Sequence, residues 1–457
     1  MNKILIAGAL ALTFTLGTPV LAQSAASGSD LAAAQAQIDA LKQQLQQLET
    51  TVDGLKAHPA AEPKEASKAL MELDNGNTTV GVQSFMDFGN ISNQQNGVDV
   101  APSGTGFDIK RFYLIVDHKF DNVWAANLTT DAQYLSEKTT SVVSSVGPPV
   151  KTSTVITSSG TAGVSEMFIK KLYLQATLDE GLVVHAGSYT SPWAPFVESL
   201  YGYRFIEKTQ TDRLGYANTA DWGLNASGKL GGGLFTYSAS IVNGGGFKNP
   251  SRSKYVDYEG RVGVTPVSWL SLGAGFYSGH LGQITTSNQN FPRNTASRWD
   301  VALGVHAAGF RIGGEYFDAK NYKSASATTG VYSASGITTN SSAAPLSDTA
   351  QGYSLWSSYD FNEQWSVFGR YDQAKPSKDV VSTLKDTYLN VGVDLKPRKN
   401  IDLALVYKNE KVENGQLSVS GADANGSYTI GGTGSTTNGL TTEGKFSEVG
   451  LYGQFNF

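Results

Sequence analysis

The chain of 457 residues contains no cysteine. A disulfide framework, a thiolate nucleophile and a cysteine-ligated metal site are therefore excluded. Charged residues are also scarce, at 16 % of the chain, against about 25 % in an average soluble protein. The formal net charge is −5, so the composition offers no basic surface of the kind that a nucleic-acid partner requires.

Long apolar runs are missing as well, since no segment reaches the ~20 apolar residues that a membrane-spanning helix needs. The N-terminal run ILIAGALALTFTLG follows Lys3 and precedes the small residues at Val20-Leu21-Ala22. This pattern predicts a secretory signal peptide over residues 1–22. An uncleaved anchor helix is the alternative, but the short run and the cleavage-site pattern favour cleavage and export.

Catalytic motifs are absent too. The five histidines have no serine or acid at a motif spacing, and no nucleophile elbow, zinc-binding helix motif or phosphate-binding loop is present. We therefore expect no enzymatic activity, no cofactor and no metal site. A lipase or protease built on a barrel is the remaining enzymatic alternative.

An apolar heptad pattern occupies residues 30–56. Spacings of three and four join Leu31, Ala34, Ile38, Leu41, Leu45, Leu48, Val52 and Leu55. This pattern predicts an α-helical coiled coil that joins several copies of the chain. A single amphipathic helix packed on its own chain is the alternative, which the polar linker at 57–78 makes less favourable.

Glycine is abundant, at 50 residues, and from Thr79 onward the apolar residues alternate with polar ones. In the segment WAANLTTDAQYL, Trp124, Ala126 and Leu128 share one parity, whereas Asn127 and Asp131 share the other. Because a strand sends successive side chains to opposite faces, such a strand has one apolar and one polar face.

Sixteen such segments are expected to form strands, so the predicted fold is all-β: a sixteen-stranded antiparallel transmembrane β-barrel over residues 79–457, preceded by the coiled coil. The expected strands are 79–89, 107–120, 124–135, 167–178, 182–189, 220–230, 233–243, 255–265, 269–278, 297–307, 309–318, 351–361, 365–373, 386–396, 400–411 and 446–457.

The connections between these strands alternate between short turns and long loops. Tight turns such as FDNVW, LDEGL and LGGGL separate long polar loops, predicted at 90–106, 136–166, 190–219, 244–254, 279–296, 319–350, 374–385 and 412–445. A membrane barrel alternates short periplasmic turns with long outer loops in this way, whereas a sandwich or propeller has no reason to do so. The coiled coil would then lie in the periplasm.

Tryptophan positions decide which face meets water. Five of the seven tryptophans fall at strand starts on the apolar parity, at positions 124, 222, 269, 299 and 365. Since tryptophan favours the membrane–water boundary, these positions predict aromatic girdles and a lipid-facing apolar surface. The polar face then lines an aqueous lumen. The last strand alternates in the same manner and ends on Phe457.

The loop 190–219 differs from the others because it is rich in aromatic and charged residues. We expect it to fold into the barrel and to form a constriction. Its charged candidates for the constriction are Glu198, Arg204, Glu207, Lys208 and Arg213. A surface loop that mediates subunit contact is the alternative.

Three segments, FDIKRFYLIVDHKFDNVW, MFIKKLYLQATLDEGLVVHAGSYTSPWAPF and FIEKTQTDRLGY, resemble the hairpins and the inward loop of the phosphate-selective porins O and P family. The resemblance covers most of residues 79–457 and implies a trimeric channel for phosphate-like anions. It implies lumen-lining roles for Arg111, Lys171, Arg204 and Lys208. The chain departs from a clean basic stripe, because inward acids, among them Asp131 and Glu315, interleave with the arginines.

The predicted function is therefore a passive outer-membrane porin, with a preference for anions. A non-selective general diffusion porin is the first alternative, and a structural barrel that tethers the outer membrane to the cell wall is the second. The expected partners are the lipid bilayer, further copies of the chain in a homotrimer, small anions or solutes in transit and, as a further candidate, peptidoglycan.

Overall fold

A computed structural model describes residues 76–134, 139–144, 153–158, 165–284, 294–325, 331–333, 347–419, 428–431 and 443–457. The expected signal peptide (1–22) and coiled coil (30–56) lie outside these residues, as does all of the expected linker (57–78) before Gly76. Within the described part of the chain, no helix is long and apolar enough to cross a membrane.

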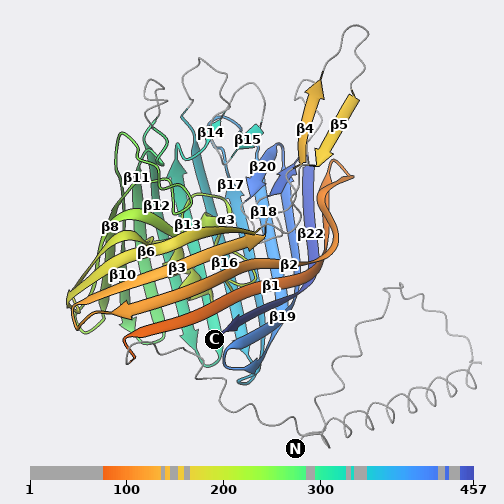
Figure 1. Cartoon of the computed structure of the whole chain (residues 1–457). Helices are drawn as coiled ribbons and strands as arrows, with labels where there is room; N and C mark the ends of the chain where they lie inside the picture. Colours follow the sequence, from red (N-terminus) through yellow and green to blue (C-terminus); the bar gives the residue numbers. More distant parts are fainter. Residues whose placement is uncertain are drawn as a thin grey trace, which may run out of the picture. The chain divides into compact units, whose positions relative to one another are not determined.

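Sixteen antiparallel strands close into one barrel (Figure 1). Each strand pairs with its neighbour along the chain, and the last strand pairs with the first. In barrel order the strands are β1 (Thr78–Gln95), β2 (Val98–Lys119), β3 (Trp124–Tyr134), β6 (Ser165–Asp179), β7 (Leu182–Thr190), β8 (Ala220–Leu230), β9 (Phe235–Val242), β10 (Asp257–Val267), β11 (Leu270–Gly279), β12 (Ala296–Ala307), β13 (Phe310–Lys320), β16 (Thr349–Asp360), β17 (Trp365–Lys375), β18 (Lys385–Arg398), β19 (Ile401–Glu413) and β22 (Glu443–Asn456).

The predicted sixteen-stranded antiparallel barrel is confirmed, and each expected strand overlaps an observed one. The strand expected at 220–230 has the same bounds as β8. At the closing seam, the N–H of Phe457 donates to the carbonyl of Val82 over 3.0 Å. The ladder therefore continues to Phe457, and backbone pairing closes the seam from Val82 to Gln95 of β1.

The prediction of a long loop at 90–106 is wrong. The strands β1 and β2 continue through it and meet at Asn96-Gly97, whose φ angles are 50° and 81°. Two successive positive φ angles define the tight hairpin turn that Asn-Gly favours. The polar, glycine-rich composition suggested a loop, but the paired strands satisfy their backbone groups in a tall hairpin.

Three other expected loops contain short strands. Strands β4 (Thr139–Ser144) and β5 (Ser153–Ser158) form a hairpin between β3 and β6. The other four are β14 (Ser324–Ala325), β15 (Val331–Ser333), β20 (Gln416–Val419) and β21 (Tyr428–Gly431). They form one small sheet, in which β15 and β20 pair in parallel, so two loops that are distant in sequence are joined outside the barrel ladder.

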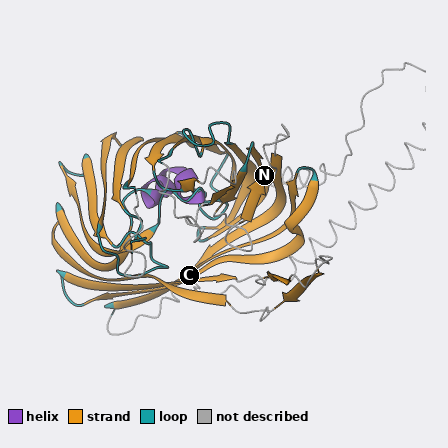
Figure 2. Cartoon of the chain, turned by 90° about the horizontal axis from the view of Figure 1, so that it is seen from above, coloured by secondary structure: helices purple, strands orange, loops and turns teal. Residues whose placement is uncertain are grey.

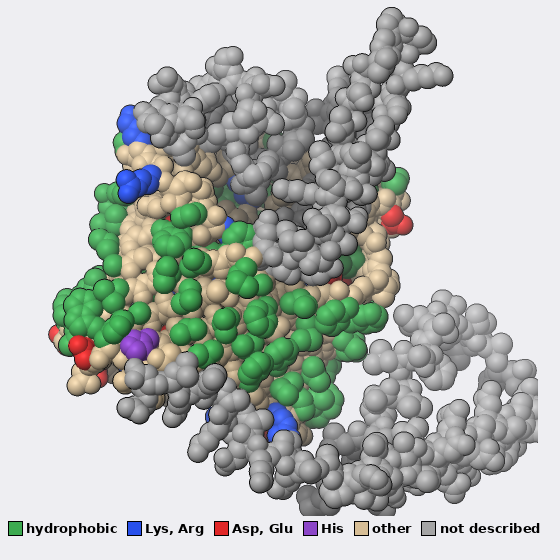
Figure 3. All heavy atoms as spheres, in the orientation of Figure 1, with side chains coloured by type: hydrophobic (Ala, Val, Ile, Leu, Met, Phe, Trp, Pro, Cys, Tyr) green, Lys and Arg blue, Asp and Glu red, His purple; other side chains and the backbone are tan. Residues whose placement is uncertain are grey.

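The outer surface of the barrel carries a band of apolar side chains (Figure 3). On β12, Trp299, Val301 and Leu303 are exposed, whereas Arg298 and Asp300, which alternate with them, are buried inside. Trp124 and Trp269 stand at the start of strands that run opposite to β12, so exposed tryptophans occur near both rims. This is the arrangement of a transmembrane barrel, with its apolar face toward lipid.

Candidate functional site

Residues 191–219 leave the wall between β7 and β8, the fifth and sixth strands of the barrel. They form helices α2 (Ala194–Tyr201) and α3 (Gln210–Arg213), which lie inside the ring of strands in Figure 2. We call residues 191–219 the inward segment. Gly202 has a φ of 83°, and its N–H donates to the carbonyl of Glu198 over 2.9 Å, which ends α2.

Aromatic packing attaches the inward segment to the wall. Tyr203 stacks on Phe368 of β17 with ring centroids 4.2 Å apart, and Tyr201 contacts Trp356 of β16 edge-on. The indole of Trp193 donates to Glu315 over 2.8 Å. All of these aromatic side chains are buried. The two tryptophans outside the predicted girdles therefore hold this segment in place.

Glycines of the wall make room for these side chains. A Cβ atom at Gly275 would lie 2.5 Å from the Trp193 ring, and one at Gly273 would lie 2.3 Å from the Phe196 ring. At Gly304 of β12, a Cβ would lie 3.0 Å from Leu200. We call these three positions the glycine shelf. Their lack of side chains lets α2 approach the backbone of β11 and β12.

Arg213 joins the inward segment to three carboxylates of the wall. Its guanidinium lies 2.8 Å from Asp386 and 3.6 Å from Asp372, and it donates to Glu410. All four side chains are fully buried. Such a cluster holds its geometry firmly, because loss of one partner leaves charges in a place that water does not reach.

Glu207 makes a second buried contact of this kind, with the ammonium of Lys408 on β19 at 3.3 Å. Burial alone would raise the pKa of Glu207, but Lys408, Lys110, Arg213 and Arg370 lower it to about 2. Glu207 and Arg213 were both expected at the constriction. Both have an exposed fraction of 0 %, and both form ion pairs with side chains of the wall.

The other three candidates on the inward segment form a chain of ion pairs. Arg204 lies 2.5 Å from Glu198 and 3.8 Å from Asp212, and Lys208 lies 3.7 Å from Asp212. Burial works against the charge of Arg204, yet Glu198 and the groups around it raise its pKa. Arg204 and Glu198 remain partly exposed, whereas Lys208 is buried.

The wall that faces this chain of ion pairs carries the two remaining candidates. Arg111 of β2 pairs with Asp131 of β3 at 3.0 Å. Lys171 of β6 is partly exposed and makes no ion pair with any described residue. Arg111 is among the groups that act electrostatically on Lys208, so the wall and the inward segment approach each other here.

Two β-bulges determine which wall side chains point inward. The register shifts at Phe85/Met86 and at Thr129/Thr130 leave Lys110 and Lys170 as the extra residues on β2 and β6. An extra residue interrupts the alternation, so two neighbours can point to the same side. On β6, Ile169 and Leu172 are exposed to the outside, and both Lys170 and Lys171 between them are turned away from it.

Three basic residues near this site were missed in the sequence analysis. They are Lys110 and Lys170 at the bulges, and Lys248 in the loop between β9 and β10. Lys248 is exposed, and its ammonium lies 4.7 Å above the Phe168 ring. The bulges had a sequence signal, since IKRF and IKKL each place two basic residues between apolar neighbours and break strict alternation. No sequence signal indicated that Lys248 lies near this site.

The polar face of β10, β12 and β13 also differs from expectation. The polar face was expected to line an aqueous lumen, but its acids Asp257, Asp300 and Glu315 are each at least 97 % buried. Glu315 accepts hydrogen bonds from Trp193 and from Thr211, at opposite ends of the inward segment. Among the described residues, no group of histidines and carboxylates has a metal-binding arrangement.

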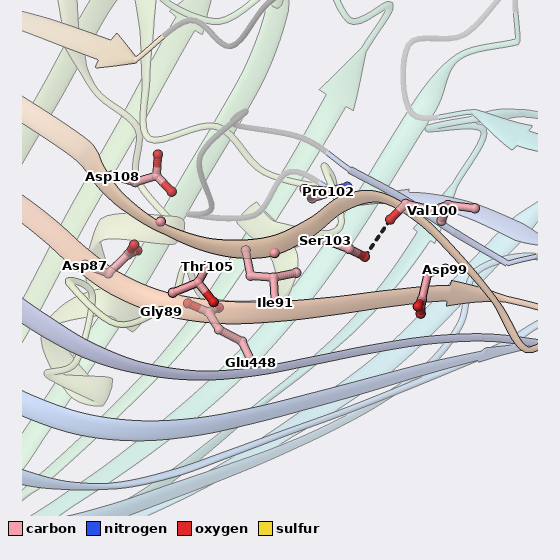
Figure 4. A pocket seen from close by; sticks show the side chains of 12 residues that line it. Asp87, Gly89, Ile91, Asp99, Val100, Pro102, Ser103, Thr105, Asp108 and Glu448 are labelled. Carbon is pink, nitrogen blue, oxygen red and sulfur yellow. Dashed lines mark hydrogen bonds between the residues drawn. The ribbon is translucent and has the colours of Figure 1, made fainter.

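A hollow of about 480 Å³ is lined by residues of β1, β2 and β22 (Figure 4). Cross-strand pairs of glycine and acid form part of its floor, including Gly89 with Gly106 and Asp87 with Asp108. Two of the four acids that line it lie near lysines, because Asp87 is 3.6 Å from Lys110 and Glu448 is 3.4 Å from Lys408. The hollow adds space inside the barrel.

A closed sixteen-stranded barrel with a lipid-facing apolar band and a segment folded inward after the fifth strand is a porin-type transmembrane β-barrel. No protein-family model and no curated protein sequence matches the chain.

Solved structures match the fold. One is an anion-selective porin from Comamonas acidovorans, at 13 % identity, covering 83 % of this chain and 100 % of that one, with a TM-score of 0.53. Another is OmpF of Salmonella typhi in complex with daunomycin, at 10 % identity, covering 83 % and 97 %, with a TM-score of 0.50. The predicted porin fold is confirmed, and the narrower resemblance to the phosphate-selective porins stays a prediction.

Proposed function

We propose that the protein is a passive outer-membrane channel for small hydrophilic solutes that prefers anions. One observation carries the preference: around the partly exposed pair Arg204 and Glu198 of the inward segment, basic side chains outnumber carboxylates. The basic residues are Arg111, Lys170, Lys171, Arg204, Lys208 and Lys248, and the carboxylates are Asp117, Asp131, Glu198 and Asp212. Clusters of lysine and arginine favour anions because charge-assisted hydrogen bonds replace part of the hydration that the ion loses.

The carboxylates of β12 and β13 weaken this anion preference only a little. Asp300 and Glu315 are buried beneath the inward segment, and Arg298 lies 2.7 Å from Asp300. A solute that passes on the open side of the segment is therefore separated from them by packed side chains. One of the similar structures is an anion-selective porin, which is in accord with this function.

The decisive experiment is a reversal potential across a planar bilayer in a salt gradient. We expect the purified protein to conduct and to give a potential on the anion side. A potential near zero would favour the general diffusion porin, and a potential on the cation side would contradict the proposal. A barrel that inserts but does not conduct would favour the structural tether.

Raising the pH should weaken the anion preference. Burial lowers the pKa of Lys208 to about 8, because Arg111, Arg204 and Lys248 add to the effect of burial and Asp212 only partly opposes it. Between about pH 7 and about pH 9, Lys208 therefore loses its positive charge while Asp212 keeps its negative one. The anion-to-cation permeability ratio is expected to fall over this range.

The variant Lys208→Arg is the matched control for this pH dependence, because a guanidinium stays protonated at both values. Reversal potentials of both proteins at the two pH values give the comparison. The fall should be smaller in the variant. An equal fall in both proteins would mean that another group titrates.

We propose a homotrimer joined by the coiled coil at residues 30–56, with a periplasmic position and peptidoglycan as a candidate partner. Deletion of 30–56, followed by measurement of the oligomer in mild detergent, tests the first part. Loss of the trimer with retained conductance per barrel is the expected result. A stable trimer without these residues would assign assembly to the barrel wall.

A further inference from the structure

The bulges at Lys110 on β2 and at Lys170 on β6 have similar sequences, but their basic residues differ in whether a carboxylate pairs with them. In FDIKRFYL on β2, the ammonium of Lys110 lies 3.6 Å from Asp87 and 2.8 Å from the carbonyl of Ile206, and Arg111 pairs with Asp131. In FIKKLYL on β6, neither Lys170 nor Lys171 has an ion pair with a carboxylate in the part of the chain that the structure describes. One basic pair is therefore compensated, and the other is not.

The contacts of the β6 pair leave its charges available. The ammonium of Lys170 lies 3.3 Å from the Tyr113 hydroxyl and 4.5 Å from the centre of its ring. Asp117 and Glu198 act on Lys171 only through space. Both lysines are partly exposed, whereas Lys110, Arg111 and Lys208 are buried. Water and ions can thus reach the β6 pair more easily than the other cations.

Two adjacent ammonium groups repel each other, and an anion between them removes this repulsion. The neighbouring Tyr113 hydroxyl can donate one further hydrogen bond to an anion oxygen. The inward segment offers no comparable place, because Arg204 and Lys208 share the carboxylates of Glu198 and Asp212. Its charges form balanced pairs that maintain its shape.

We infer that Lys170 and Lys171, with Tyr113 beside them, form the anion-binding subsite that sets the selectivity of the channel. The wall strand β6, and not the inward segment, then supplies the net positive charge that a solute meets. Lys248 is exposed at the loop above and lies over Phe168 of the same strand, so it extends the positive surface from the subsite toward the mouth. The inference rests on the proposed anion preference.

The test compares two double variants in the same salt gradient. Lys170→Met/Lys171→Met removes the uncompensated charges and should lower the anion-to-cation permeability ratio by about fivefold or more, since a charge at contact distance is worth at least ~1 kcal/mol. Lys110→Met/Asp87→Asn removes a lysine and its carboxylate partner together at the bulge on β2. It should leave the ratio within about twofold of the unaltered protein.

A third variant, Lys170→Arg/Lys171→Arg, keeps both charges and should keep the preference, which separates charge from misfolding. Retained selectivity in the Met/Met variant, or an equal loss in the Lys110/Asp87 control, would overturn the inference. These outcomes differ from failure of the proposed function, which would appear earlier as an unaltered protein without anion preference. In that case the subsite has no selectivity to set.

Discussion

Replacing Arg213 with methionine is expected to destabilise the protein by about 3–5 kcal/mol. The substitution removes the one ion-pair partner that Asp386 has among the described residues and leaves Glu410 and Asp372 with less compensation in a fully buried place. Carboxylates that cannot reach water must then stay unpaired, take up protons or break the packing around them. Urea unfolding in lipid vesicles measures the effect.

The control for this prediction is Arg252→Met, in the exposed loop between β9 and β10. It also removes one arginine but should change the free energy of unfolding by no more than about 0.5 kcal/mol. A second comparison adds Asp386→Asn to Arg213→Met, which should recover part of the loss. An Arg213→Met protein as stable as the control would show that the buried cluster does not hold the inward segment.

Substitutions that fill the glycine shelf should have the second large effect, on both conductance and stability. In Gly273→Ala/Gly275→Ala, the new methyl groups would lie 2.3 Å and 2.5 Å from the rings of Phe196 and Trp193, closer than atoms can pack. Overpacking of this kind costs about 1–3 kcal/mol at each site. We expect α2 to move off β11 and β12 toward β2 and β3 across the barrel. Single-channel conductance should therefore fall, and the protein should unfold at lower urea concentration.

Gly106→Ala is the matched control for the shelf. Gly106 lies in a strand and faces the hollow on β1 and β2, and a Cβ built there meets no atom within 4 Å. The same chemical change should leave both conductance and stability nearly unaltered. If the shelf variant conducts as well as this control, the inward segment does not limit the width of the channel.

Strand positions followed from local pattern alone. The alternation of Trp299, Val301 and Leu303 with Asp300 needs no partner strand to be recognised, because the pleat sends neighbouring residues to opposite faces in any sheet. The part of the β1–β2 hairpin within residues 90–106 escaped prediction although Asn96-Gly97 is a strong turn signal. Its flanks lack apolar alternation, and only pairing with β22 and with each other makes them strands.

The candidate site was harder to derive. Sequence composition singled out the inward segment and its five charged candidates, and the resemblance to the phosphate-selective porins added Arg111 and Lys171, but neither distinguished their charges from one another. Arg213 and Lys171 differ entirely in surroundings, since the first contacts three carboxylates from β17, β18 and β19 and the second contacts none among the described residues. Those carboxylates lie more than 150 positions away in the chain, so no local pattern relates them to Arg213.

By itself, the sequence determined the kind of architecture: a barrel of sixteen strands, apolar toward lipid and polar within. That information is local, because side-chain alternation, turn residues and tryptophan placement each involve neighbours along the chain. Only the tertiary structure decided which charges are compensated and which remain open to solute. Ion pairing depends on distances across the lumen, and the bulges at Lys110 and Lys170 and the closure of the barrel determine those distances.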